Sequence, residues 1–151
     1  MKLYKYIPIG SLITLLIIFS SCDKASNNPR GCVTTFIIAL EQHDMNKAWG
    51  LLGKDAQSYY NQLGEKQRRS GKGAFENEIN RIKTFRNARH DYSIRTDKDY
   101  QDGMKLVVNG GKEFKIQISN EDGEFKIKDE SSVKNILVVI TGELKTEEKT
   151  Y

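Results

Sequence analysis

Cys22 is the residue whose surroundings point most clearly to a chemical role. It follows two lysines near the start of the chain, a dense apolar run over residues 12–19 and two small residues that end at Ser21. A charged region, then an apolar region, then small residues is the order of a secretory signal. We therefore predict that residues 1–21 are an export signal and that the domain lies outside the cytoplasm.

The cysteine narrows this prediction. The stretch Phe19-Ser20-Ser21-Cys22 resembles a bacterial lipobox, the recognition site of lipoprotein signal peptidase, although Phe19 stands where Leu, Val or Ile is usual. The resemblance implies that the thiol of Cys22 receives a diacylglyceryl group. It also implies that cleavage between Ser21 and Cys22 makes the cysteine the new N-terminus, with palmitate as a further acyl chain.

Two other interpretations of the leader stay open, a plain secretory signal and an uncleaved membrane anchor. As a helix, residues 6–21 would span about 24 Å, which is short for a hydrocarbon core of about 30 Å. The polar residues 22–28 then read as a tether between the lipid and a folded domain. The expected location is the cell envelope, attached to a membrane whose identity and leaflet the sequence leaves open.

Charge gives no support for a nucleic-acid partner. The 151-residue chain has 24 basic and 20 acidic residues, but two of the lysines belong to the leader. Without them the formal charge falls to +2, and no nucleic-acid-binding motif is present. The expected partners are membrane lipid and either an envelope protein or a small apolar ligand.

Catalytic and metal-binding motifs are missing from the sequence. The two histidines, His43 and His90, lie far apart and have no partner at metal-ligand spacing. No nucleophile elbow, zinc-protease or phosphate-loop sequence occurs. We predict no cofactor, no metal and no catalytic residue, and we expect Cys32 to be a buried free thiol.

Helical spacing of apolar residues dominates the first half of the mature chain. Asn28-Pro29 predicts a capped helix start, and Val33, Phe36 and Leu40 fall on one helical face. Shorter helices are expected over residues 45–52 and 55–63, the latter closed by Gly64. A basic loop should follow over residues 65–72, and a longer helix over residues 75–86.

Near residue 90 the apolar period changes from 3.6 to 2. Alternating strands are expected over residues 92–96, 104–108, 114–118 and 125–127, joined by glycine-containing turns. The apolar run at 136–140 is assigned to a final buried strand because it is β-branched, with a short helix as the alternative. Helices followed by an antiparallel meander indicate an α+β domain over residues 29–141, with a charged tail over residues 142–151.

The stretch over residues 36–52, a helix that ends in an acidic turn followed by Ala48-Trp49 and two leucines, resembles the opening of nuclear-transport-factor-two-like (cystatin-like cone) domains. Among these it is most similar to small lumazine-binding-like bacterial lipoproteins. The strand and turn at residues 124–129 fit the same resemblance. It implies helices packed on a curved, cone-like meander sheet.

Enzymes of that fold place acidic or imidazole groups inside the cone, whereas the inward strand positions here are apolar except Tyr92. We therefore expect a non-catalytic domain that binds a ligand or a protein. An isomerase- or dehydratase-like enzyme that uses Tyr92 or His90, and a structural envelope component, remain the alternatives. The candidate pocket residues are aromatic: Phe36, Trp49, Tyr59, Tyr92 and Phe114.

Overall fold

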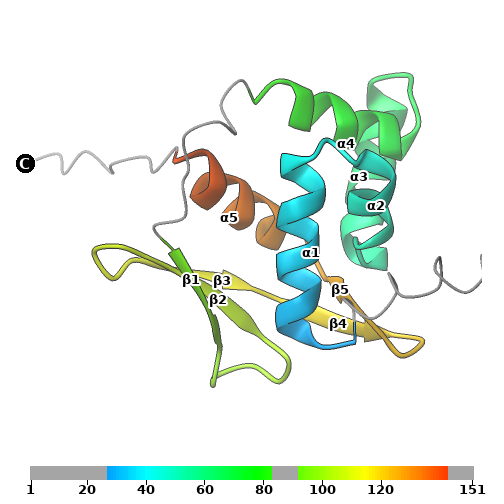
Figure 1. Cartoon of the computed structure of the whole chain (residues 1–151). Coiled ribbons are helices and arrows are strands. Elements are labelled where there is room, and N and C mark those ends of the chain that lie inside the picture. Colours follow the sequence, from blue (N-terminus) through cyan, green and yellow to red (C-terminus); the bar gives the residue numbers. More distant parts are fainter. Residues whose placement is uncertain (1–26, 83–91, 143–151) are drawn as a thin grey trace, which may run out of the picture.

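The computed structural model describes residues 27–82 and 92–142, which form five helices and five strands (Figure 1). The expected leader, Cys22, His90 and the tail after residue 142 lie outside the described residues. The helices are α1 (Pro29–Glu41), α2 (Met45–Gly50), α3 (Lys54–Lys66), α4 (Gly71–Asn80) and α5 (Glu130–Thr141). The strands are β1 (Tyr92–Thr96), β2 (Met104–Val108), β3 (Glu113–Ile116), β4 (Ile118–Glu121) and β5 (Glu124–Ile127).

Helix α1 begins as its sequence predicts. The Asn28 side chain accepts a hydrogen bond from the Gly31 amide at 2.7 Å, and Pro29 occupies the first turn, where its missing N–H costs nothing. Val33, Phe36 and Leu40 are fully buried along one face. The expected apolar stripe of α1 is therefore confirmed.

The junction between α3 and α4 differs from the prediction. Helix α3 continues past Gly64 to Lys66, so the connecting turn is shorter than the expected loop over residues 65–72. Gly64 is buried, and a Cβ there would lie 2.7 Å from the carbonyl oxygen of Arg69. The glycine therefore permits a close approach of the following turn and does not end the helix.

The alternating pattern predicts the strands well. In the three-stranded antiparallel sheet, β2 lies between β1 and β3, and Ile94 faces Leu106, which in turn faces Phe114. These side chains point inward with Met104 and Ile116, which are almost completely buried. The opposite face carries mostly polar side chains, as expected for a sheet with one solvated face.

The expected single meander is divided at Gln117. β3 ends at Ile116 and β4 starts at Ile118, and β4 pairs only with β5 in a separate two-stranded sheet. The Gln117 amide donates to the Ser132 hydroxyl at 2.8 Å, and its carbonyl accepts from the Lys128 amide at 3.0 Å. Both backbone groups of the linking residue are thus satisfied by partners outside the three-stranded sheet.

The assignment of residues 136–140 to a strand is wrong, because they belong to helix α5. The Asp129 side chain caps the helix by accepting from the Ser132 amide at 2.8 Å, and Gly142 ends it in the left-handed conformation. Val133, Ile136 and Ile140 are buried at helical spacing. Packing of this apolar face therefore outweighs the β propensity of the branched residues.

Together the elements form a mixed α+β arrangement in which the helices lie on one side of the strands (Figure 1). Helix α1 contacts β5 and the first two strands, and α5 packs on β2 and β3. Helices α3 and α4 pack on each other beside them. None of the helices within the described ranges has the length and apolar character needed to cross a membrane.

Candidate functional site

Three of the predicted pocket residues belong to an aromatic cluster between helices α1 to α4. Phe36 and Trp49 lie 6.5 and 6.0 Å from Phe75, measured between ring centroids. Tyr60 lies 5.1 Å from Phe75, and Tyr59 lies 5.2 Å from Tyr60. Because Phe36, Tyr60 and Phe75 are fully buried, these rings fill the interior.

The other two predicted pocket residues lie on the three-stranded sheet. Tyr92 faces Val108 in the sheet register, and Phe114 faces Leu106. Both are partly buried against the core. Burial, with a smaller contribution from the nearby Glu41 carboxylate, raises the pKa of Tyr92. The five predicted residues therefore fall into two groups, one among the helices and one on the sheet.

A polar cluster that the sequence analysis missed lies where helices α3, α4 and α5 meet. The Tyr60 hydroxyl is buried and, among the residues that the structure describes, makes no hydrogen bond of standard geometry, although the Glu78 carboxyl group is near enough to interact with it. Its polar neighbours are the carboxyl groups of Glu78 and Glu130. Glu130 forms an ion pair with Lys134, whose ammonium group lies 5.7 Å from the centre of the Tyr59 ring.

Electrostatics in this cluster favour the protonated forms of its acids. Burial, followed by the negative charges of Glu78 and Glu130, raises the pKa of Tyr60 far above its usual range. Burial and Glu130 also raise the pKa of Glu78, although Lys134 opposes the shift. Glu78 therefore takes up a proton more readily than a surface carboxylate, and Tyr60 stays a neutral hydrogen-bond donor.

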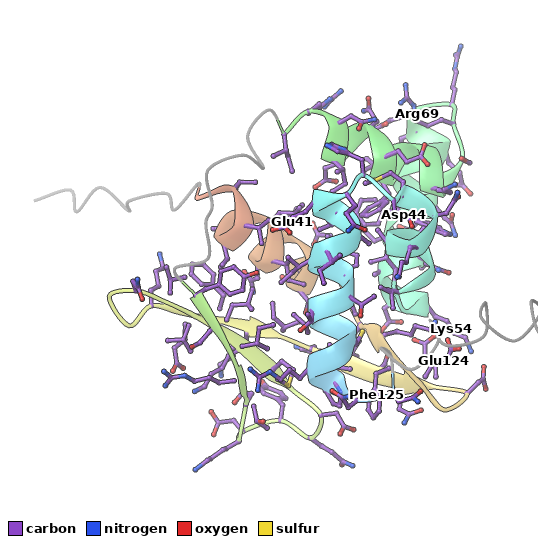
Figure 2. All side chains as sticks on the ribbon, viewed as in Figure 1. Glu41, Asp44, Lys54, Arg69, Glu124 and Phe125 are labelled. Atoms are coloured by element: carbon purple, nitrogen blue, oxygen red, sulfur yellow. The ribbon has the colours of Figure 1, made fainter. Side chains whose placement is uncertain are left out.

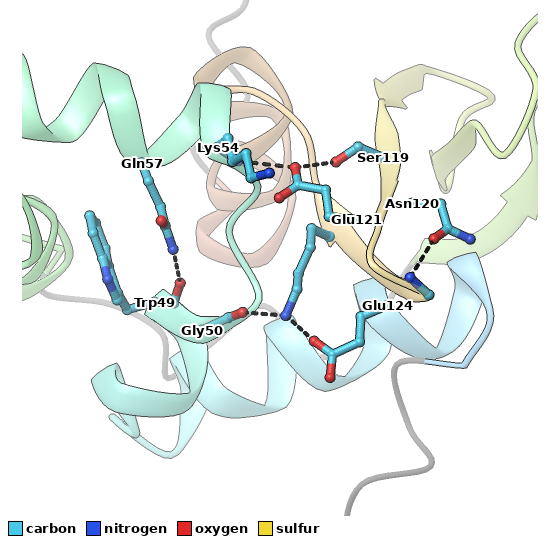
Figure 3. A network of polar contacts seen from close by, with 10 residues as sticks. Trp49, Gly50, Lys54, Gln57, Ser119, Asn120, Glu121 and Glu124 are labelled. Carbon is cyan, nitrogen blue, oxygen red and sulfur yellow. Dashed lines mark hydrogen bonds and ion pairs between the residues drawn. The ribbon is translucent and has the colours of Figure 1, made fainter.

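A second polar network joins the β4–β5 hairpin to the turn between α2 and α3 (Figure 3). One oxygen of Glu121 accepts from the Lys54 amide at 3.0 Å and from the Ser119 hydroxyl at 2.9 Å. The Lys126 ammonium donates to the Gly50 carbonyl at 2.8 Å. The Lys54 and Gly50 contacts join the hairpin to the backbone of this turn, whereas the Ser119 contact lies within β4. The first two contacts therefore fix the position of the hairpin.

Two neighbouring hollows occupy the face of the three-stranded sheet that the helices leave free. The first has a volume of about 600 Å³, and its polar lining includes Ser93, Arg95, Asn109 and Glu113. The second, of about 530 Å³, shares Arg95 and Glu113 with the first and continues to Asp97. These volumes are within the range of small-molecule binding sites.

Charges on this face are mostly paired. Lys105 forms an ion pair with Glu113 at 2.8 Å, and Lys115 lies 3.9 Å from Asp99. The hydrogen bond to Glu113 is the main cause that raises the pKa of Lys105. The Arg95 Nε group donates to the Ser93 hydroxyl at 3.1 Å. Among the residues that the structure describes, Arg95 has no carboxylate partner.

Several sequence predictions concern residues that carry no structural description here. Ser21 and Cys22, the predicted cleavage and lipidation residues, precede the described range, and His90 lies in the gap between its two parts. Within residues 27–82 and 92–142, no three His, Cys, Asp or Glu side chains gather as a metal site would require. Cys32 is completely buried, and burial raises the pKa of its thiol to about 12.

Sequence reasoning missed Glu78, Glu130 and Arg95 for a shared reason. Each stands in a polar context, and its role emerges only when helices or strands distant in the chain come together. Arg95 lies opposite Lys105 in the register of β1 and β2. The alternating pattern of the two strands, together with the turn that joins them, could have predicted this register. Comparison of the chain with protein-family models, with curated proteins and with solved structures finds no match.

Proposed function

We propose that the protein is a bacterial lipoprotein, held at a membrane of the cell envelope by acylated Cys22, whose α+β domain binds a partner and catalyses no reaction. The observation that carries the anchored arrangement is the start of the fold. Helix α1 begins at Pro29 under the Asn28 cap, just after the polar segment that follows Cys22. The domain therefore begins directly after the proposed tether, which itself follows the proposed leader and acylation site.

The tether holds the domain close to the membrane. Fully extended, the segment from Cys22 to Asn28 reaches about 20 Å, and α1 itself, with 13 residues, is about 20 Å long. Figure 2 places Phe125 beside the start of α1, whereas Glu41 and Asp44 lie at its other end. The β4–β5 hairpin therefore belongs to the end of the domain from which the tether leaves.

The distribution of side chains supports binding at the surface. The aromatic rings of Phe36, Tyr60 and Phe75 are packed together in the interior, while the hollows lie on the solvated face of the sheet. A curved, cone-like sheet of the nuclear-transport-factor-two-like kind is part of the proposal. The single residue between β3 and β4, Gln117, is consistent with a sharp bend at that point.

One observation favours the alternative of an isomerase- or dehydratase-like enzyme. Glu78, a carboxyl group with a raised pKa, lies near the buried Tyr60 hydroxyl, and such pairs of acids occur at catalytic sites. In this alternative the pair would replace the expected Tyr92 and His90. Turnover of a steroid-like or polyketide substrate that is lost in Glu78→Gln would establish it.

The proposal is tested by native mass spectrometry of the full-length protein extracted from membranes in detergent. We expect a mass that corresponds to cleavage before Cys22 and addition of acyl chains, together with a bound molecule or protein released on activation. An acylated protein that carries no bound molecule and instead co-purifies in fixed ratio with other envelope proteins would favour a structural role. An unacylated full-length chain would overturn the anchored arrangement.

A further inference from the structure

Three cations stand in one row across the solvated face of the three-stranded sheet. Arg95 on β1 is directly opposite Lys105 on β2, and Lys105 is directly opposite Lys115 on β3. Like charges directly opposite each other in a sheet are destabilising. Nearby anions are therefore needed to offset the repulsion between these three side chains.

Within the part of the chain that the structure describes, carboxylates pair with two of the three cations. Glu113 pairs with Lys105 and Asp99 with Lys115, whereas Arg95 has only the Ser93 hydroxyl as a partner within the described residues. A guanidinium group presents several donors in a plane and binds oxyanions through two parallel hydrogen bonds. Arg95 thus has donors available for an anion from outside the chain.

The larger hollow offers space for that anion. Besides Arg95, its lining includes Ser93, Asn109, Gly110 and Gly111. Both glycines have positive φ, and a Cβ at either position would meet no atom within 4 Å, so the backbone of this turn is open. A ligand can therefore approach Arg95 from the side of the turn.

The remaining charge in the larger hollow does not oppose an anion strongly. Glu113 is the only acidic side chain among the described residues that line it, and the 2.8 Å ion pair with Lys105 offsets the charge of that carboxylate. The smaller hollow is less suitable, because Asp97 and Asp99 line it. The larger hollow is thus the better site for a negatively charged group.

We propose that the larger hollow on the β1–β2–β3 face binds a phosphate group, with Arg95 as the main contact and Ser93 and Asn109 as further hydrogen-bond donors. A phosphate monoester fits better than a carboxylate because its greater charge and third free oxygen allow it to accept from Arg95 and from Ser93 or Asn109 at once. The volume of about 600 Å³ leaves room for the rest of a phosphate ester. This site rests on the proposed binding function and is independent of the lipid anchor.

The test uses full-length protein, extracted from membranes in a nonionic detergent and labelled with ¹⁵N. Glycerol 3-phosphate and inorganic phosphate are titrated as soluble sources, and phosphatidic acid, whose headgroup is a phosphate monoester, is added to the micelles as a lipid source. We expect a saturable shift of the Arg95 Nε–H resonance and of the Ser93 amide. A shift with the lipid alone identifies a lipid headgroup as the ligand. A shift with glycerol 3-phosphate or inorganic phosphate identifies a soluble phosphate compound as the ligand.

The variants Arg95→Gln and Lys98→Gln separate the site from general charge. Lys98 is an exposed cation that lines only the smaller hollow. Losing charge-assisted hydrogen bonds should weaken binding to Arg95→Gln by about tenfold or more, while Lys98→Gln stays within about twofold because its charge is screened. The thermal midpoints without ligand show whether each variant is folded.

Two results would overturn the site: no saturable shift with any of the three probes, or equal weakening by both substitutions. Either result leaves the proposed function intact if the same protein is acylated and carries another bound molecule in mass spectrometry. Conversely, phosphate binding by an unacylated chain would support the site while the anchored arrangement fails. The two proposals can thus fail separately.

Discussion

Replacing Tyr60 with phenylalanine removes one buried hydroxyl and leaves the ring in place. The side chain is completely buried, and the hydroxyl lacks a hydrogen bond of standard geometry among the described residues, so folding removes its water and only the nearby carboxyl groups compensate in part. Leaving a polar group buried and unsatisfied costs about 1–3 kcal/mol. Because the nearby carboxyl groups return part of that energy, we expect Tyr60→Phe to stabilise the protein by about 1 kcal/mol.

The measurement is thermal and urea denaturation followed by circular dichroism at pH 7. For a chain of this size, about 1 kcal/mol corresponds to a rise of about 4 °C in Tm. Tyr59→Phe is the matched control, since this neighbouring ring is 37% exposed and its hydroxyl can reach water. We expect the control to change stability by less than about 0.5 kcal/mol.

A loss of about 1 kcal/mol or more in Tyr60→Phe would refute the reasoning. Such a loss would mean that the hydroxyl donates a strong hydrogen bond to the Glu78 carboxylate in the folded protein. The double variant Tyr60→Phe, Glu78→Gln then measures the coupling between the two groups. Our account predicts a weak coupling.

Three further predictions concern Glu78, Cys32 and Gly64. Folding raises the pKa of Glu78, so its contribution to stability weakens as pH rises from its usual pKa through the raised value. Glu78→Gln should therefore raise Tm at pH 7 but not at pH 4, and equal shifts at both would be contrary evidence. The Cys32 thiol, with its pKa near 12, should react with iodoacetamide at pH 8 far more slowly in the native protein than in urea. Mass spectrometry of the Cys32 peptide measures this, and similar rates would show that the thiol is accessible. Gly64→Ala should cost about 1–3 kcal/mol through the clash at its close contact. Gly50→Ala has open space around it and should stabilise by about 0.5 kcal/mol; urea denaturation compares the two, and equal effects would remove the packing argument.

Local patterns were sufficient to predict much of the fold. The cap at Asn28 and the apolar stripe of α1 depend on residues within a few positions of each other, so the sequence predicts them directly. The strand alternation is equally local, and Leu106, Ile116 and Ile127 are buried as it predicts. Where neighbouring residues decide the conformation, the prediction holds.

Helix α5 shows how a local rule can mislead. The β-branched run at 136–140 favours a strand, yet Asp129 precedes it as a helix cap, and Val133, one turn before the run, extends its apolar face with helical period. That longer pattern was available in the sequence and outweighs the propensity of five residues. The residues that flank the run therefore decide its conformation.

The polar cluster around Tyr60 and the break at Gln117 were beyond the reach of sequence reasoning. Tyr60, Glu78 and Glu130 belong to three helices, and their proximity depends on how those helices pack. The division of the meander at Gln117 depends likewise on Ser132, which helix α5 carries. Tertiary contacts of this kind leave no periodic signal in the chain.

The central claim is that acylated Cys22 holds a binding domain at a membrane. Incorporation of labelled palmitate into cells that express the wild-type protein or Cys22→Ala tests this claim most directly. We predict that the wild-type protein carries the label and fractionates with membranes, and that the variant does neither. An unlabelled wild-type protein, or a variant that is labelled equally, would contradict the account.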